Sequence, residues 1–205
     1  MNALYESWPR RELFEFFSRV SDPFYSVTFR LDVTRLRSFC KERGLSFYLT
    51  LVWLSTKAFN DTPAFSYALR GGALARLPER RPSFTDLLPG AEQFHIVTMA
   101  AGESLEAFCR AGKAKSAAQT VLLDTSEEGD DLIFFSCLPW VDLTGLTNER
   151  DFDRDDSVPR VTWGQYIERD GRLELGYSVE VNHRFIDGMH IGQFAQKLQA
   201  LIDAL

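Results

Sequence analysis

The sequence predicts an α/β fold, a two-layer sandwich built on a mixed β-sheet. Three observations lead to this prediction. Helix and strand patterns are mixed along the chain without a regular βαβ rhythm, several strand pairs carry the short turns of hairpins, and no linker-like segment divides the chain. A chain of 205 residues is also long enough for one hydrophobic core of good size. We therefore expect a single domain over residues 1–205.

The first sixty residues predict a helix, a strand and two further helices. Apolar residues of RRELFEFFSRV recur three and four positions apart, which indicates a short amphipathic helix. PFYSVTFRLDV alternates apolar and polar residues, as a half-buried strand does. TRLRSFCKERG indicates a helix that ends at Gly44, and FYLTLVWLSTKAFN, which is apolar nearly all round, indicates a buried helix.

The middle of the chain predicts a hairpin, two short strands and a helix. AFSYALRGGALARL indicates a hairpin that turns at Gly71 and Gly72. SFTDLL and QFHIVTMA indicate short strands, and SLEAFCRAGKAKSAAQTVL indicates a helix with Ser104 as its N-cap. The acidic stretch DTSEEGDD that follows is expected to be a solvated surface loop.

The last third predicts a strand, a polar excursion, a hairpin and a final helix. DLIFFSCLPW indicates a short apolar strand that Pro139 stops. Residues 142–160 are polar and long enough to be either a functional loop or an insertion. VTWGQYIERDGRLELGYSVEVNH indicates a hairpin that turns at Asp170 and Gly171, and the helix after it carries an apolar stripe.

Composition excludes some classes of function. The net charge is -6, and no basic block stands out, so nucleic acid is not an expected partner. No apolar run is long enough to span a bilayer, and the first residues do not form a signal peptide. The three cysteines are far apart, so we expect reduced thiols in a cytoplasmic protein. The 17 phenylalanines predict a thick core, an apolar pocket or a subunit interface.

The last predicted strand ends at a histidine. By the alternation of the strand, His183 falls on the apolar face, at the rim of the core where the final helix begins. Partial desolvation there favours the neutral imidazole, which can accept a proton. His183 is therefore either a general base or a core histidine satisfied by one hydrogen bond. Asp187 is also of a residue type that caps the start of a helix. His190 and Asp203 show no recognised metal-ligand spacing, so no metal is expected.

The pattern His183-x-x-x-Asp187-Gly188 is a signature of acyltransferases that use coenzyme A thioesters. SWPRRELFEFF, FFSCLPWVDL and PRVTWGQY precede it in that order. Together these stretches resemble the chloramphenicol acetyltransferase family from about Trp8 to the C-terminus. The resemblance implies a homotrimer with active sites at subunit interfaces. It also implies transfer of acetyl from acetyl-CoA to a hydroxyl of a small molecule, with chloramphenicol, and so antibiotic inactivation, as the first expectation.

The same resemblance implies roles for individual residues. His183 matches a catalytic histidine that removes the hydroxyl proton. Ser136 matches a serine beside the coenzyme whose hydroxyl donates to the tetrahedral oxyanion, and Thr162 matches a threonine that holds a water near that oxygen. Asp187 matches a structural aspartate paired with an arginine of the RRE stretch, which we assign to Arg10 although Arg11 is adjacent.

Aromatic residues match the binding sites of the family. Phe16, Phe17 and Phe94 match positions that line the acceptor pocket, although each is equally compatible with an ordinary core phenylalanine. Tyr48 and Tyr166 match positions that contact coenzyme A. The resemblance therefore implies contacts with the acceptor and with acetyl-CoA, which is a co-substrate.

The sequence departs from the family pattern near the histidine and near the coenzyme. Asn182 replaces the first of two adjacent histidines, the larger residues 184–186 replace small ones, and Ser46 replaces a lysine beside the coenzyme. NHRFIDG also resembles the DHRxxDG of dihydrolipoamide acyltransferase cores. Those cores follow other domains through Ala/Pro-rich linkers, whereas here the first helix is expected about ten residues from Met1. A non-catalytic relative that binds a ligand or partner is the third alternative.

Overall fold

The computed structural model describes residues 2–150 and 155–205. Its strands are β1 (Phe24–Asp32), β2 (Tyr67–Arg70), β3 (Ala73–Arg76), β4 (Arg81–Asp86), β5 (His95–Thr98), β6 (Leu132–Leu138), β7 (Arg160–Gly164), β8 (Ile167–Arg169) and β9 (Arg172–Asn182). Its helices are α1 (Ala3–Glu6), α2 (Arg11–Phe17), α3 (Thr34–Arg43), α4 (Phe47–Asn60), α5 (Leu105–Ala118) and α6 (Gly188–Asp203), with short 3-10 turns η1 (Pro63–Ser66) and η2 (Thr125–Glu127).

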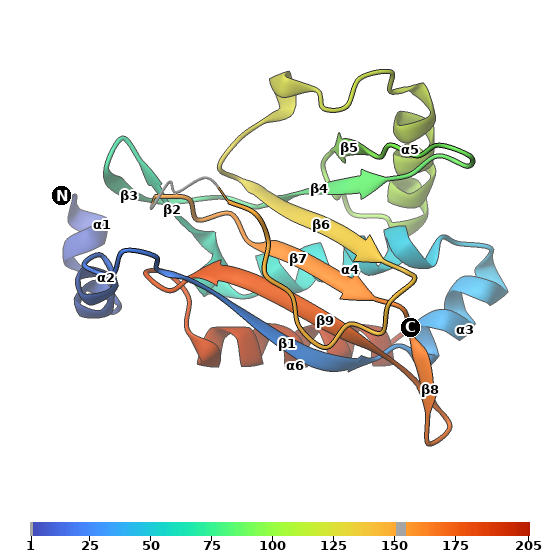
Figure 1. Cartoon of the computed structure of the whole chain (residues 1–205). Helices are drawn as coiled ribbons and strands as arrows, with labels where there is room; N and C mark the ends of the chain where they lie inside the picture. The colour runs from blue at the N-terminus through green and yellow to red at the C-terminus, as the bar shows by residue number, and fades with distance from the viewer. Residues whose placement is uncertain (1, 151–154) are drawn as a thin grey trace.

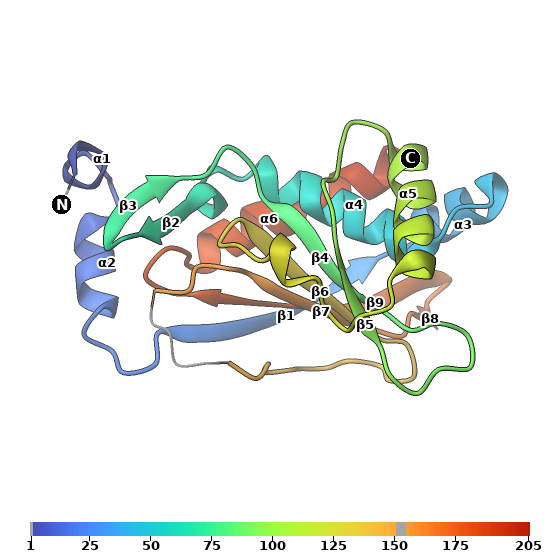
Figure 2. The same ribbon diagram turned by 90° about the horizontal axis from the view of Figure 1, so that it is seen from above.

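The main sheet is mixed, as the sequence predicts. Its strand order is β1-β9-β7-β6-β4-β5, with β8 paired to β9, while β2 and β3 form a separate hairpin (Figure 1). Strands β4, β6 and β7 are parallel neighbours, and the other pairs of the sheet are antiparallel. Figure 2 shows the helices α4, α5 and α6 on one side of this sheet, which gives the expected two-layer α/β sandwich.

The core lies between the sheet and helices α4 and α6. Leu175, Tyr177 and Val179 alternate along β9 and are fully buried on the helix side. Phe59 of α4 stacks on Phe194 of α6 with ring centroids 4.1 Å apart. Burial of such large apolar side chains contributes about 1.5–3 kcal/mol each, so this face fixes which side of β9 points inward. Among the described residues, no helix is long and apolar enough to cross a membrane.

Residues 139–150 cross the other face of the sheet. A Cβ at Gly176 of β9 would lie 1.8 Å from the carbonyl oxygen of Leu143, so only glycine permits this close approach. Further along, the backbone N–H of Asn148 and the guanidinium of Arg150 donate to the buried Glu180 carboxylate, at 2.9 and 2.7 Å. The polar excursion predicted over 142–160 is therefore a cover for the sheet as far as residue 150. Residues 151–154 of that prediction lie outside the described residues.

Both predicted hairpin turns are confirmed. Gly71 and Gly72 have φ angles of 58° and 75°, and Asp170 and Gly171 have φ angles of 51° and 78°. These left-handed conformations match the tight turns that twisted hairpins favour. Gly44 ends α3 with a φ of 64°, which is the predicted C-cap conformation.

The acidic stretch DTSEEGDD lies on the surface, as predicted, and none of its residues is buried; Glu127 within it accepts hydrogen bonds from Arg81 at 2.9 Å and Lys115 at 3.1 Å. One strand boundary of the sequence prediction is wrong. The strand predicted over SFTDLL ends two residues early, at Asp86. A turn follows there, in which Ala91 N–H donates to the Leu88 carbonyl and Gly90 has a φ of 80°.

Candidate functional site

His183 follows the last residue of β9 and is half-buried. Its backbone N–H donates to the Pro23 carbonyl at 2.7 Å. Its ring stacks on Phe17 of α2 with centroids 3.8 Å apart, and the ring of Tyr25 of β1 lies 4.4 Å away. Three elements distant in sequence therefore hold the imidazole at the rim of the core, as the alternation of the strand predicts.

Arg10 organises the loop between β9 and α6. It is buried, with 8% of its surface exposed, and its guanidinium donates to three acceptors of that loop. These are the carbonyl of His183 at 2.7 Å, the carbonyl of Arg184 at 3.2 Å and the carboxylate of Asp187. Arg11 instead pairs with Glu6 at 3.0 Å on the surface. The structure therefore selects Arg10 over Arg11 as the partner of Asp187.

Asp187 combines both roles that the sequence left open. Besides its ion pair with Arg10, its carboxylate accepts a hydrogen bond from the N–H of Met189 at 3.2 Å. His190 returns a hydrogen bond to the backbone, accepting from the N–H of Asp187 at 3.2 Å, which completes a capping box at the start of α6. One side chain thus begins the helix and also fixes the His183 loop through Arg10.

The surroundings of His183 favour its neutral form. Burial lowers the pKa of His183, and the positive charge of Arg10 lowers it further, while Asp187 opposes them. Burial raises the pKa of Asp187, but the hydrogen bond and positive charge of Arg10, together with His190 and the N–H of Met189, outweigh burial and hold the pKa below its ordinary value. At neutral pH the site therefore contains an unprotonated imidazole beside an intact ion pair.

The loss of activity at acidic pH is expected to follow the protonation of His183. If His183 is a general base, only its neutral imidazole can accept the proton, so kcat/KM should fall about tenfold per pH unit below the pKa of His183, with a midpoint under 6.5. In Asp187→Asn the midpoint should move lower still, since the carboxylate that raises this pKa is removed. Asp203→Asn, at the far end of α6, should leave it unchanged. A midpoint at or above 6.5, or one insensitive to Asp187, would contradict this assignment.

Ser136 and Thr162 lie on the face of the sheet opposite the helices. They are direct register partners on β6 and β7, and Thr162 also faces Ser178 of β9. The hydroxyl of Thr85 donates to that of Ser136 at 3.4 Å, and the hydroxyl of Thr162 donates to the side-chain carbonyl of Asn148 at 3.5 Å. A row of hydroxyl side chains therefore crosses four neighbouring strands beneath the segment that covers the sheet.

Tyr48, Tyr166 and Phe94 lie at the same end of the sheet as Ser136. The hydroxyl of Tyr48 donates to the Thr85 carbonyl at 2.7 Å, and burial raises its pKa, so it stays protonated. The hydroxyl of Tyr166 accepts from the guanidinium of Arg37 at 3.0 Å. Phe94 directly precedes β5 and is 51% exposed.

His183 and Ser136 are far apart within one chain. His183 is five residues beyond Ser178, which is in register with Thr162 and, through it, with Ser136. This places the two side chains about 17 Å apart along the strands and about 10 Å apart across them. The predicted site residues therefore form two groups. Phe16, Phe17, Arg10 and Asp187 surround His183, whereas Thr162, Tyr48, Tyr166 and Phe94 accompany Ser136.

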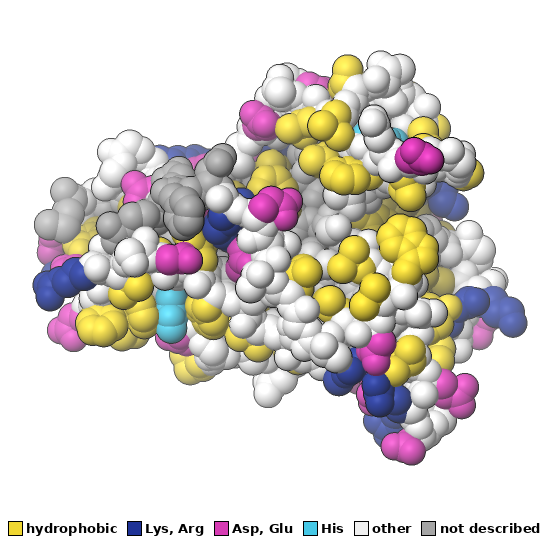
Figure 3. Space-filling view, viewed as in Figure 1, with side chains coloured by type: hydrophobic (Ala, Val, Ile, Leu, Met, Phe, Trp, Pro, Cys, Tyr) yellow, Lys and Arg dark blue, Asp and Glu magenta, His cyan; other side chains and the backbone are white. Residues whose placement is uncertain are grey.

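Exposed hydrophobic side chains accompany both groups. In the face shown in Figure 3 they gather near the α1–α2 end of the molecule and again over the end that carries β4, β5 and α5. Around the His183 group the exposed members are Leu13 (46%), Phe16 (61%), Val20 (37%) and Met189 (64%). Around the Ser136 group they are Leu87 (42%), Leu88 (37%), Phe94 (51%), Trp140 (72%) and Val141 (50%). Apolar patches of this kind often mark binding surfaces.

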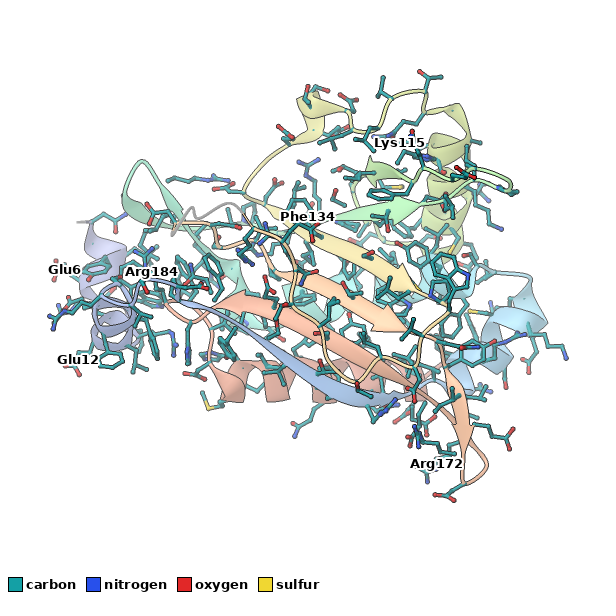
Figure 4. All side chains as sticks on the ribbon, in the orientation of Figure 1. Glu6, Glu12, Lys115, Phe134, Arg172 and Arg184 are labelled. Carbon is teal, nitrogen blue, oxygen red and sulfur yellow. The ribbon has the colours of Figure 1, made fainter. Side chains whose placement is uncertain are left out.

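Sequence reasoning missed several residues that shape the site. Alternation along PFYSVTFRLDV places Tyr25 among the apolar residues of β1, but its contact with His183 depends on the pairing of Tyr25 with Val181. Arg184, which is labelled in Figure 4 and replaces a small residue of the family pattern, is buried. Its guanidinium lies over the Phe14 ring and pairs with Asp155. Among the described residues, no group of His, Cys, Asp and Glu side chains is placed to hold a metal ion.

The chain is similar in sequence to known proteins. The sequence pattern of one family, Chloramphenicol acetyltransferase, matches residues 3–199. The chain is 28% identical to chloramphenicol acetyltransferase 2 of Escherichia coli over 96% of this chain and 94% of that protein. It is 29% identical to a chloramphenicol acetyltransferase of Streptomyces acrimycini, over 96% and 91%.

Solved structures show the same fold. A chloramphenicol acetyltransferase superposes with a TM-score of 0.89 at 23% identity and covers 97% of both chains. The dihydrolipoamide acetyltransferase of Azotobacter vinelandii superposes with a TM-score of 0.68 at 19% identity, over 93% of this chain and 85% of that one. Both families that the sequence resembles therefore include proteins with the fold of this chain.

Proposed function

We propose that this chain, which belongs to the chloramphenicol acetyltransferase family and is an acyltransferase, transfers the acetyl group of acetyl-CoA to a hydroxyl group of a small molecule. Chloramphenicol is the first acceptor to expect, because proteins that are similar to nearly the whole of this chain are named chloramphenicol acetyltransferases. The observation that carries the chemistry is His183, a neutral imidazole held at the molecular rim and flanked by apolar rings.

In the proposed mechanism His183 acts as general base. It removes the proton of the acceptor hydroxyl as that oxygen attacks the thioester carbonyl. The Ser136 hydroxyl donates a hydrogen bond to the oxyanion that develops on the former carbonyl, and Thr162 holds a water close to it. One such donor is worth about 3 kcal/mol in the transition state. As the tetrahedral centre collapses, the C–S bond breaks, and the proton held by His183 passes to the leaving thiolate of coenzyme A.

This mechanism needs two copies of the chain. A general base and an oxyanion donor act on one carbonyl, yet His183 and Ser136 belong to the two separated groups described above. We therefore propose that His183 of one subunit faces Ser136 and Phe94 of its neighbour in a homotrimer. A head-to-tail interface of this kind closes into a ring, and it would cover the exposed hydrophobic side chains of both groups.

Turnover with defined acceptors tests the proposed function. Purified protein is given acetyl-CoA with either chloramphenicol or dihydrolipoamide, and the acetylated product is identified by chromatography and mass spectrometry. An O-acetylated product from chloramphenicol supports the proposal. Acetylation of dihydrolipoamide alone would instead assign the chain to the dihydrolipoamide acyltransferases. If a screen of small hydroxyl acceptors also gives no product, the chain is a non-catalytic relative, contrary to the proposal.

Coenzyme recognition is expected to depend little on the 3′-phosphate. Ser46, which replaces the lysine of the family pattern, accepts a hydrogen bond from the Leu49 N–H at 3.3 Å and caps α4. Arg43, which is paired with Glu106 at 3.4 Å, and Lys41 are the nearby cations that would have to compensate for the missing lysine. We predict KM values within about fivefold for acetyl-CoA and its 3′-dephospho form, because one exposed ion pair contributes about 0–1 kcal/mol. A tenfold or larger preference for acetyl-CoA would contradict this prediction.

A further inference from the structure

Three polar side chains outside both groups form a hydrogen-bonded chain. They are Asp86 at the end of β4, His95 at the start of β5 and Ser116 in α5. His95 and Ser116 are 8% and 2% exposed. The Nε2 atom of His95 lies 2.9 Å from the hydroxyl oxygen of Ser116, and that hydroxyl donates to the Asp86 carboxylate. Figure 4 marks this region by Lys115, the residue before Ser116.

The direction of these hydrogen bonds excludes a nucleophilic role. A serine hydroxyl has one hydrogen, and that of Ser116 points to Asp86. His95 must therefore donate from Nε2, so it is not placed to remove the proton of Ser116. Ser116 is also too deeply buried to meet a substrate. The chain of donors runs from His95 through Ser116 to Asp86, which suits a fixed structural connection.

This connection lies at the base of one loop. Asp86 and His95 form the last register pair between β4 and β5, so residues 87–94 leave the sheet at that pair. The Asp86 carboxylate also accepts a hydrogen bond from the Leu87 N–H at 3.1 Å. Through Ser116, both ends of the loop are thus attached to helix α5. Since β5 is a short strand at the edge of the sheet, its few ladder hydrogen bonds alone hold the loop weakly.

The same loop borders the Ser136 group. The carbonyl of Thr85, the residue before Asp86, accepts a hydrogen bond from the Tyr48 hydroxyl. The hydroxyl of Thr85 donates a hydrogen bond to the Ser136 hydroxyl. Phe94, the residue before His95, is half exposed. A shift at the base of the loop would therefore change the distance between the Phe94 ring and Ser136.

We propose that Asp86, Ser116 and His95 are positioning residues that hold the 87–94 loop as one wall of the acceptor pocket. This proposal rests on the proposed function, in which Phe94 contacts the acceptor. A wall fixed before the acceptor arrives lowers the entropy lost on binding. The network should therefore lower the KM for the acceptor, with little effect on the KM for acetyl-CoA or on proton transfer at His183.

Two substitutions of His95 separate hydrogen bonding from packing. His95→Gln keeps an N–H donor near the position of Nε2, whereas His95→Leu keeps the bulk and removes the donor. We expect His95→Leu to raise the acceptor KM about three- to tenfold, the effect of one lost hydrogen bond. The KM for acetyl-CoA should change less than twofold, and His95→Gln should restore most of the acceptor affinity. Thr62→Val is the control, since it removes a buried hydroxyl that donates to the Ala58 carbonyl at the far end of α4.

Hydrogen exchange supplies a readout that does not depend on activity. Amides of residues 87–94 should exchange faster in His95→Leu than in the wild type, and at the wild-type rate in His95→Gln. An unchanged acceptor KM, equal rises in both KM values, or the same KM pattern in Thr62→Val would overturn the proposal. If the wild type acetylates no hydroxyl acceptor, the proposed function fails and the acceptor role of the loop fails with it. The exchange rates then still decide whether the network holds the loop.

Discussion

Replacing His183 with alanine is expected to lower kcat by about 10²- to 10⁴-fold, the usual contribution of a general base. The fold should remain intact, because alanine keeps the backbone hydrogen bonds of residue 183 to Pro23 and Arg10 and removes only the ring contacts with Phe17 and Tyr25 at the rim of the core. The measurement is steady-state turnover with chloramphenicol, together with circular dichroism and the mass of the assembly.

A neighbouring histidine provides the control for this prediction. His190 lies at the start of α6 and contacts Asp187 rather than the proposed acceptor pocket. His190→Ala should weaken the helix cap and cost some stability, but it should lose far less activity than His183→Ala. Near-normal turnover in a folded His183→Ala protein would remove His183 from the mechanism.

Breaking the Arg10–Asp187 pair is expected to cost about 2 kcal/mol of folding free energy, because a buried guanidinium loses its carboxylate. The value is below that of a fully buried pair, since Asp187 is 28% exposed. Asp187→Asn should therefore lower thermal stability and activity together, as the His183 loop loses its anchor. The measurement is denaturant unfolding alongside turnover.

A double-mutant cycle shows whether the two residues act as one unit. Arg10→Ala combined with Asp187→Asn should cost less than the sum of the single changes. The exposed pair of Arg11 and Glu6 is the matched control, and its cycle should give a coupling of about 0.5 kcal/mol or less. Strictly additive losses for Arg10 and Asp187 would show that their contact does not stabilise the loop.

The sequence predicted the position of His183 because strand alternation is a local property. Periods of two residues in β9 and of three to four in α6 place His183 at the junction of core and rim. The choice between Arg10 and Arg11 was not local. It depends on how α2 packs against a loop more than 170 residues later, and adjacent residues of identical type carry no signal for that packing. The resemblance implied only an arginine of the RRE stretch, which we assigned to Arg10, and the structure pairs Arg10 with Asp187.

The separation of the two groups of site residues could not be predicted from spacing alone. It depends on the register of β6, β7 and β9, which sequence patterns leave open. The chain of Asp86, His95 and Ser116 was missed for a similar reason. Each residue fits its own element, with Asp86 at a strand end and Ser116 on the buried face of a helix. Only the packing of α5 on the edge of the sheet brings the three together.

Mixed assemblies test the shared site most directly. One chain carries His183→Ala, and the other carries Phe94→Asp, which alters an exposed loop residue and leaves the core unchanged. Each protein should be nearly inactive alone. The two are denatured, mixed in equal amounts and refolded together. If the site is shared, about a quarter of the sites combine an intact His183 with an intact Phe94, as random mixing at a head-to-tail interface gives. Activity should then recover to about that fraction of the wild-type value. Activity that stays at the level of the separate variants would show that each subunit holds its own complete site, contrary to this account.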